Sequence, residues 1–177
     1  MMACAIAGCI TTKRPLLSEN RLDQSIQKTN EALSIYYYAG FTVDRTSLDQ
    51  LALLRRVFEE HVAQQVTIVA EPPAKERHVR VYQRSTPVQA TVMERLSEVT
   101  FWLIPYYKAG VRETVDYDLY LDTVLVKTYR YAISEKTFIW MLNLPFVWIN
   151  LLTNDSSDAF EATIHEFIRD ARNDGNL

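Results

Sequence analysis

The sequence predicts an α+β domain: a mainly antiparallel sheet packed by about three helices, preceded by a flexible N-terminal tether. Residues 111–121 alternate apolar and polar side chains, which is typical of an antiparallel strand with one packed and one wet face. Residues 47–63 and 157–171 instead carry apolar side chains at helical spacing. The chain has 177 residues, of which 48% are hydrophobic, and this length suits one domain.

The first elements are expected after residue 33. Residues 34–38 and 41–43 are rich in aromatic and β-branched side chains, as strands are, and Gly40 separates them. Ser47 and Gln50 form a capping-box pair that starts a helix of about 17 residues. The apolar stripe of this helix consists of Leu51, Leu54, Phe58 and Val62.

Two strands and a short helix follow. Residues 66–70 and 78–82 predict strands, and residues 71–75 an exposed loop, because its two prolines cannot join a central ladder. Pro87 fits the first turn of a short helix that runs to about Ser97. We expect three apolar side chains of this helix to point inward: Val88, Val92 and Leu96.

The remaining strands lie between residues 100 and 132. Residues 100–104 are apolar on both faces and predict a buried strand. In strand 111–121, the packed face consists of Val115, Tyr117, Leu119 and Leu121. The wet face consists of Asp116, Asp118, Tyr120 and Asp122. A second strand is expected over residues 124–132, after a turn near Thr123.

A last helix closes the chain. Residues 155–157 supply its N-terminal cap, and Gly175 follows its end. Its apolar face consists of Ala159, Phe160, Thr163, Ile164, Phe167, Ile168 and Ala171.

The N-terminus carries a lipobox-like sequence, Ile6-Ala7-Gly8-Cys9. In a lipobox, small residues precede the cysteine whose sulfur takes the diacylglycerol. We therefore expect residues 1–9 to be the end of a signal peptide with Cys9 lipidated, residues 10–32 a polar tether, and residues 33–177 the single domain. The resemblance to lipoproteins of enteric-type bacteria implies transfer to the outer membrane, because Ile10 rather than an aspartate follows the cysteine. No lysine or arginine precedes Cys9, so either the true start lies upstream of Met1 or the match is accidental.

Composition argues against several function classes. The net charge is −3 and no basic stripe occurs, so nucleic acid is not an expected partner. The four glycines are widely spaced, so no phosphate-binding loop is present. No G-x-S-x-G sequence occurs, and Arg169 stands where an H-E-x-x-H motif starting at His165 needs its second histidine. We expect no catalytic residue, no metal site and no cofactor.

Three weaker candidates remain. His61 follows two glutamates and is expected on a solvated surface. The aspartates at 116, 118 and 122 share a flat strand face, whereas calcium ligands converge from a loop, so no calcium site is expected. Residues 36–38, Tyr106 and Tyr107 would form either an aromatic contact surface or half-buried strand positions.

Residues 138–152 form the most unusual segment. These fifteen residues are too few to span a bilayer as a helix, which needs about 20, and a proline interrupts them. Two interpretations stay open: a buried core segment, or a loop that contacts a membrane or a partner. The contact residues would then be Trp140, Leu144, Pro145, Phe146 and Trp148.

Several motifs over residues 95–170 resemble a known group of proteins. The motifs are Leu103-Ile104-Pro105, the alternating strand pair, Tyr129-Arg130-Tyr131 and Trp140-Met141-Leu142-Asn143-Leu144-Pro145. This succession is similar to uncharacterised lipoproteins of proteobacteria and other diderm bacteria. The resemblance implies an envelope location and supplies no activity.

The expected function is therefore a non-enzymatic envelope lipoprotein, acyl-anchored through Cys9 at the outer membrane and facing the periplasm. It would serve as an interaction or accessory domain for an envelope protein partner. The alternative is a periplasmic domain that binds a lipid or other apolar ligand with residues 138–152. A cytosolic interaction module is a third reading.

Overall fold

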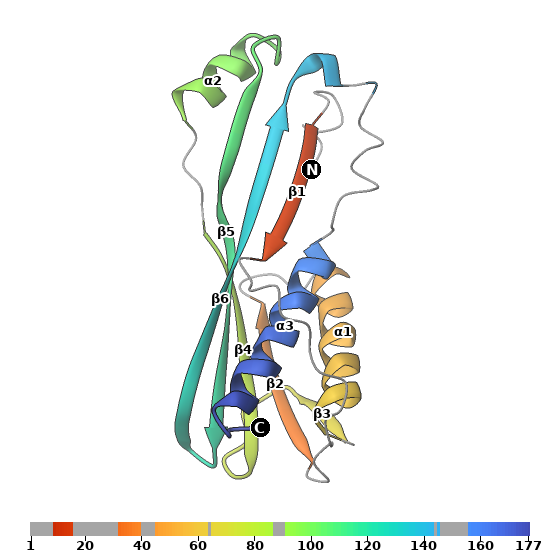
Figure 1. The fold of residues 1–177 in the computed structure, drawn as a ribbon, viewed down its shortest axis with the longest axis vertical. Coiled ribbons are helices and arrows are strands. Elements are labelled where there is room, and N and C mark those ends of the chain that lie inside the picture. The colour runs from red at the N-terminus through yellow and green to blue at the C-terminus, as the bar shows by residue number, and fades with distance from the viewer. Residues whose placement is uncertain are drawn as a thin grey trace.

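The computed structural model describes residues 9–15, 32–39, 45–63, 65–86, 91–143, 145 and 156–177. In this part of the chain, six strands form one sheet with three helices beside it (Figure 1). The elements are β1 (Cys9–Pro15), β2 (Leu33–Ala39), α1 (Arg45–His61), β3 (Val66–Val69), β4 (Arg77–Ser85), α2 (Val92–Val99), β5 (Tyr106–Leu121), β6 (Val124–Ile139) and α3 (Ser156–Asn173). None of these helices combines the length and apolar character that crossing a membrane requires.

The strand order in the sheet is β1-β6-β5-β4-β2-β3. The pairs β1–β6, β6–β5 and β5–β4 are antiparallel, whereas β2 pairs in parallel with both β3 and β4. The predicted α+β class with a mainly antiparallel sheet is therefore confirmed.

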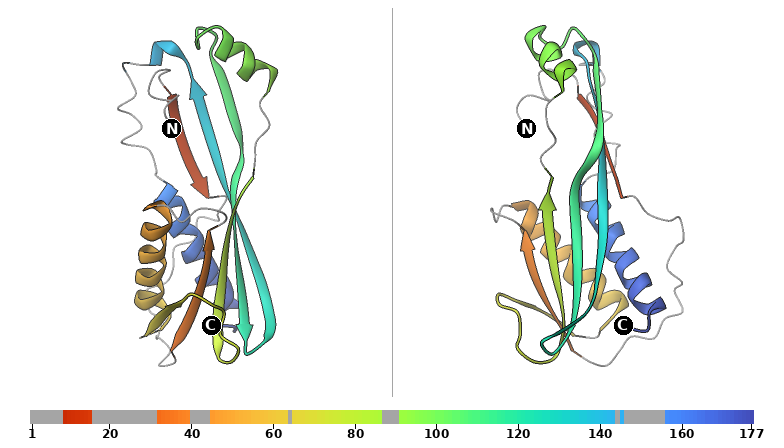
Figure 2. Two further views of the ribbon diagram at one scale, coloured as in Figure 1. Left: turned by 180° about the vertical axis from the view of Figure 1, so that it is seen from behind. Right: turned by 90° about the vertical axis from the view of Figure 1, so that its left-hand side faces the viewer.

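The molecule is elongated because β5 and β6 are long, at 16 residues each (Figure 1). Their lower halves join β4, β2 and β3 in the part covered by α1 and α3. Their upper halves extend beyond this part, where β1 lies beside β6 and α2 beside β5 (Figure 2). A register shift between Val111 and Glu113 separates the two halves of β5.

The main core lies between α1, α3 and the lower half of the sheet. Val79 and Val81 of β4 are fully buried there, as is Tyr117 of β5, whose ring stacks on Phe167 of α3 at 4.7 Å. Burying each such side chain contributes about 1.5–3 kcal/mol. All seven residues of the predicted apolar face of α3 are buried, which confirms that prediction.

Residues 10–15 differ from the tether predicted for residues 10–32. They belong to β1, which pairs with β6 from Cys9↔Ile139 to Pro15↔Ile133. The β-branched residues Ile10, Thr11 and Thr12 favour extended backbone, and β6 offers them a free edge. Residues 16–31 lie outside the described part, so the rest of the tether stays a prediction.

The strand predicted at 100–104 is wrong. These residues form a turn between α2 and β5, and Phe101 and Leu103 are exposed. Continuous apolar sequence is typical of a buried strand, but this segment lies at the end of the molecule with no layer over it (Figure 1).

β6 is longer than the predicted strand 124–132 and runs on to Ile139. It therefore includes Phe138 and Ile139 from the segment predicted as core or contact loop. Their partners are Tyr107 and Tyr106 of β5.

Two predictions about β5 side chains also need correction. Asp116 lies on the face away from α1 and α3, as expected, but it is only 3% exposed because Arg130 and Arg84 cover it. Leu121, predicted to be packed, is exposed where the β5–β6 hairpin extends past the helices.

Candidate functional site

Most of the candidate contact residues lie at the end of the molecule that carries α2. Cys9, at the start of β1, pairs with Ile139 at the end of β6, and Ile139 also pairs with Tyr106 at the start of β5. The backbone of the predicted lipidation residue therefore lies at the same end as α2 and Trp140.

Helix α2 contacts the sheet through its polar side. The carboxylate of Glu94 accepts hydrogen bonds from the Tyr106 hydroxyl at 3.1 Å and from Nζ of Lys108 at 3.0 and 3.1 Å. The Ser97 hydroxyl, fully buried, donates to the carbonyl of Ile104 at 2.7 Å. Glu94 also closes a capping box with Thr91, so one side chain both starts the helix and attaches it.

Glu94 is held in its ionised form. Desolvation by burial opposes ionisation, but hydrogen bonds from Lys108 and Tyr106 outweigh it and keep the pKa of Glu94 below its ordinary value. The polar attachment of α2 is thus present at neutral pH.

The apolar side of α2 faces outward, which corrects the sequence-based prediction. Val92 is 82% exposed and Val99 77% exposed, and Leu96 between them is exposed as well. These residues recur every three to four positions on the side opposite Glu94 and Ser97. Residue 88, predicted to point inward with them, lies outside the described part.

Two further segments at this end of the molecule also expose apolar side chains. One segment is the turn after α2, where Phe101 is 76% exposed, and the other is the turn after β6. We call the set the apolar tip: Val92, Met93, Leu96, Val99, Phe101, Leu103, Met141 and Leu142.

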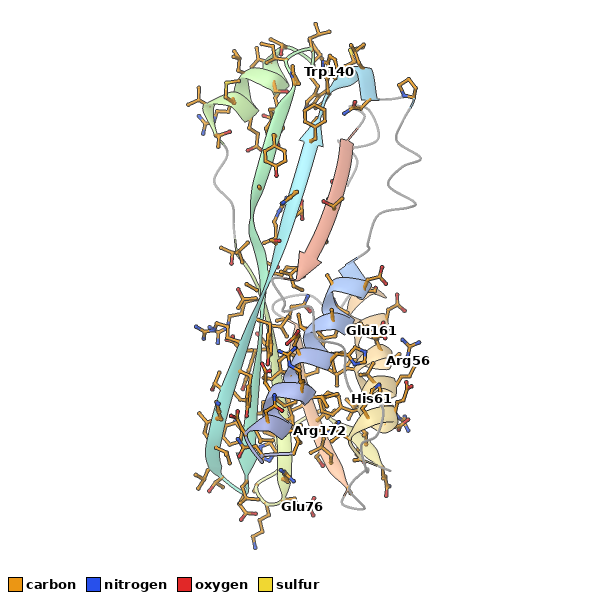
Figure 3. All side chains as sticks on the ribbon, viewed as in Figure 1. Arg56, His61, Glu76, Trp140, Glu161 and Arg172 are labelled. Atoms are coloured by element: carbon orange, nitrogen blue, oxygen red, sulfur yellow. The ribbon has the colours of Figure 1, made fainter. Side chains whose placement is uncertain are left out.

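The two turns of the apolar tip are joined by hydrogen bonds. The backbone N–H of Met141 donates to the carbonyl of Trp102 at 3.0 Å. The indole N–H of Trp140 donates to the carbonyl of Leu103 at 3.2 Å. Trp140 is half-buried at this end of the molecule (Figure 3).

The end of α2 is a Schellman motif with an unusual residue. The N–H of Trp102 bonds to the carbonyl of Ser97, and that of Phe101 to Glu98. Phe101 and Trp102 have φ of 52° and 59°, in the left-handed region that favours glycine. A phenylalanine thus occupies a glycine-type position while its ring is exposed.

Only part of the predicted contact set lies within the described residues. Trp140 takes part in the base of the apolar tip, and Pro145 is exposed. Leu144, Phe146 and Trp148 lie outside the described part. The exposed stripe of α2 was missed because periodicity identifies a stripe but not the side on which the sheet lies.

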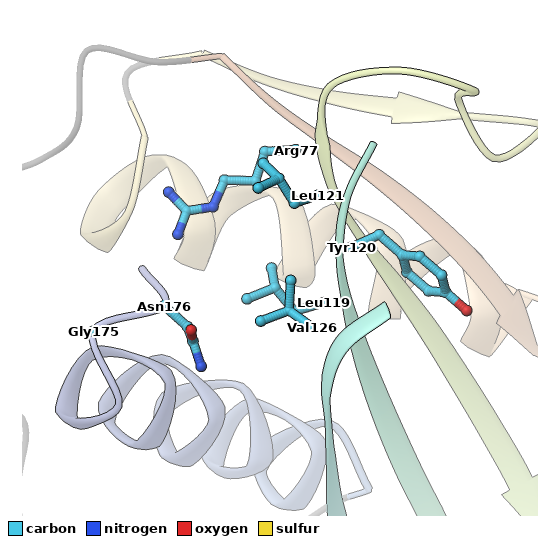
Figure 4. Close-up of a pocket in the computed structure, with 7 residues that line it drawn as sticks. All are labelled: Arg77, Leu119, Tyr120, Leu121, Val126, Gly175 and Asn176. Atoms are coloured by element: carbon cyan, nitrogen blue, oxygen red, sulfur yellow. The ribbon is translucent and has the colours of Figure 1, made fainter. Parts of the chain in front are cut away.

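Within the described part of the chain, two pockets lie toward opposite ends of the molecule. One, of about 210 Å³, is under α2 and is lined by Glu94, Glu98, Lys108, Arg112 and Glu135 among others. The other, of about 440 Å³, lies at the opposite end, where Arg77, Leu121, Val126 and Asn176 surround it (Figure 4). Neither is an apolar cavity between the sheet and the α1–α3 layer.

The other candidates have local partners. Asp118 accepts a hydrogen bond from Thr128 at 2.6 Å, and Asp122 accepts one from the backbone N–H of Glu76 at 3.0 Å. His61 was predicted on a solvated surface, but its side chain is half-buried. Its ring centroid lies 5.1 Å from that of His165. Among the described residues, no three histidine, cysteine or carboxylate side chains gather as a metal site would need.

The tyrosines split between the two predicted roles. Tyr37 is partly buried and donates to Gln50 or Gln83, both at 2.7 Å. Tyr36 and Tyr38 lie on the other face, each against Tyr82. Tyr106 is buried under α2, whereas Tyr107 is exposed.

Comparisons with known proteins find similarity among solved structures. No family model matches the chain, and no curated protein matches it. Among solved structures, the chain is similar to a dodecamer of a PelC variant from Paraburkholderia phytofirmans, at 9% sequence identity, over 89% of this chain and 93% of that one. The TM-score is 0.37, too low to support an argument about fold or function.

Proposed function

We propose that the protein is a non-enzymatic envelope lipoprotein, anchored through acyl chains on Cys9 and serving as an interaction or accessory domain. The supporting observation is the pairing of Cys9 with Ile139, which puts the start of β1 at the end of the molecule that exposes the apolar tip. An acyl anchor on Cys9 would hold this end against the membrane.

The anchor and the apolar tip would then act together. One acyl chain alone binds a membrane reversibly, whereas the several chains of a bacterial lipoprotein anchor it stably. The apolar tip would add a contact that orients this end of the molecule against the membrane. The α1–α3 part lies at the other end of the long axis (Figure 1) and would project into the periplasm toward a partner.

Binding of an apolar ligand between sheet and helices receives less support. Such a protein needs a mostly apolar pocket of about 300–1,000 Å³. The larger described pocket lies at the hairpin end, lined partly by Arg77 and Asn176, and away from residues 138–143. The space between α1, α3 and the sheet holds close-packed side chains such as Phe58, Tyr117 and Phe167.

Metabolic labelling with a palmitate analogue in the native host, expressed from the genomic locus, tests the anchor. We expect label on the wild type and none on Cys9→Ala. The matched control is Cys4→Ala, which removes the other cysteine of the chain and should keep the label. Label that persists in Cys9→Ala, or no label on any form, would contradict the proposal.

A further inference from the structure

Helix α2 turns its apolar side away from the sheet, so this side needs a binding partner to bury it. We infer that the apolar tip inserts into the interfacial layer of a lipid bilayer, and that apolar burial rather than net charge drives the insertion. The inference rests on the proposed envelope location, but its test uses no acyl chain.

The first argument is the composition of the apolar tip. Three segments contribute side chains to one end of the molecule, and hydrogen bonds from Met141 and Trp140 to the turn after α2 hold them together. An exposed apolar cluster of this kind marks a docking surface. Trp102 and Trp140 are half-buried at its base, and tryptophan favours the membrane–water interface.

The second argument is the conformation of Phe101. A left-handed residue other than glycine is unfavourable by about 1–2 kcal/mol. Glycine at this position would satisfy the Schellman motif equally well. Since the ring is exposed, the unfavourable conformation is not offset by packing in the core, and a contact outside the molecule accounts for it.

The third argument is the charge next to the apolar tip. The ionised groups of α2 and of the pocket below it balance, with three acidic and three basic side chains: Glu94, Glu98, Glu135, Arg95, Lys108 and Arg112. Lys108 is paired with Glu94, and Arg112 lies 3.4 Å from Glu135. Because the charges balance and two of the three cations already have carboxylate partners, this end of the molecule has little to offer an anionic headgroup, and a zwitterionic surface suits it.

Vesicle flotation tests the inference, using the full chain with Cys9→Ala so that no acyl chain contributes. We expect binding to phosphatidylcholine vesicles that changes less than about twofold when salt is raised to 1 M, where the Debye length is about 3 Å. Phe101→Glu and Val99→Glu should each weaken binding by at least about tenfold, since each removes an inserted apolar side chain. Tryptophan fluorescence, to which Trp102 and Trp140 contribute, should shift to shorter wavelength on binding.

Leu125→Glu is the matched control. Leu125 is an exposed apolar residue of β6 at the opposite end of the molecule, so its substitution should leave vesicle binding unchanged. Phe101→Gly covers the case in which a glutamate disturbs folding, because it should weaken binding without lowering the melting temperature.

Three results would overturn the inference. One is binding that needs anionic lipid and is lost at high salt. Another is equal binding by wild type and Phe101→Glu. The third is no vesicle binding together with a dimer, seen by sedimentation, that Phe101→Glu dissociates; a second copy would then be what covers the apolar tip.

The anchor proposal can fail separately. Vesicle binding by the unacylated chain without palmitate labelling in the host would keep the membrane contact and remove the lipoprotein. Labelling at Cys9 without vesicle binding would keep the lipoprotein and remove the inserting tip.

Discussion

Glu94 on α2 and Lys108 on β5 form an ion pair in which the ammonium nitrogen lies 3.0 and 3.1 Å from the two carboxylate oxygens. The same carboxylate accepts from the Tyr106 hydroxyl and from the backbone N–H of Thr91. One side chain thus fixes the start of α2 and its polar side, and the apolar side is left facing outward.

Glu94→Ala should lower the free energy of unfolding by about 1–2 kcal/mol, because it removes half of the capping box and leaves the partly buried Lys108 without its partner. Urea denaturation measures the change. Glu98→Ala, an exposed substitution on the same helix, should stay within about 0.5 kcal/mol. Equal losses in the two variants would contradict the role given to Glu94.

The contribution of Glu94 should also depend on pH. Its pKa in the folded protein is lowered from the ordinary 4.5, so below this value the unfolded chain binds more protons than the folded one. The contribution is complete above pH 4.5 and is lost as the pH falls through the folded-state pKa. The stability difference between wild type and Glu94→Gln should shrink accordingly; a difference that persists in strong acid would speak against it.

Phe101→Gly should raise the free energy of unfolding by about 1 kcal/mol, because glycine adopts the positive φ of this position without a Cβ penalty. Phe101→Ala is the control: it removes the ring but keeps the Cβ, so it should bring no such gain. Guanidinium denaturation of the three proteins distinguishes them. If alanine and glycine stabilise equally, the ring and not the backbone is the source of the strain.

The sequence predicted α3 well and α2 badly, and the reason lies in what each helix packs against. In α3, Phe160 and Phe167 belong to a stripe buried by the sheet and α1, so an apolar stripe and an inward face coincide. In α2 the stripe of Val92 and Val99 is equally regular, but the side of the helix that contacts the sheet is the one that carries Glu94. Periodicity locates a stripe, whereas its direction depends on residues distant in sequence.

The upper half of the sheet was missed for a related reason. Beyond Ala132, β6 carries Ser134, Glu135 and Lys136, which show no apolar alternation. Its strand conformation there depends on backbone pairing with β5 on one side and β1 on the other. Nothing in the pattern of residues 10–15 indicates that they supply this partner.

Tyr117 and Thr163 form a buried hydrogen bond, with 2.9 Å between the two hydroxyl oxygens. The Thr163 hydroxyl donates to the carbonyl of Phe160 at 2.7 Å, so the Tyr117 hydroxyl donates to Thr163. Thr163→Val should lower the free energy of unfolding by about 1–3 kcal/mol, since it leaves the buried Tyr117 hydroxyl without its acceptor. Tyr117→Phe should lower it by only about 0.5–1.5 kcal/mol, because the Thr163 hydroxyl still donates to the carbonyl of Phe160.

The double variant Tyr117→Phe with Thr163→Val should lose less than the sum of the two single losses, because no unpaired hydroxyl then remains at this contact. Chemical denaturation of the four proteins gives the coupling free energy. Strictly additive losses would show that the two hydroxyls do not depend on each other.

His165 on α3 should make the domain sensitive to mild acid. Its ring lies against His61 of α1, and its Nε2 is 3.9 Å from Glu161; His61 and Glu161, both labelled in Figure 3, lie at this junction of the two helices. Burial and the neighbouring His61 lower the pKa of His165 below its ordinary 6.5, against the opposing effect of Glu161 and Glu60.

The unfolded chain therefore binds the His165 proton more readily than the folded one. Its contribution to stability is complete above pH 6.5 and declines as the pH falls, until the folded histidine is protonated too. His165→Gln should flatten the pH dependence of the free energy of unfolding in this range. Glu161→Gln should do the opposite, because removing the carboxylate lowers the pKa of His165 further and extends the decline to lower pH. Denaturation curves of the three proteins between neutral and mildly acidic pH measure this, and the same slope in wild type and His165→Gln would rule His165 out as the group responsible.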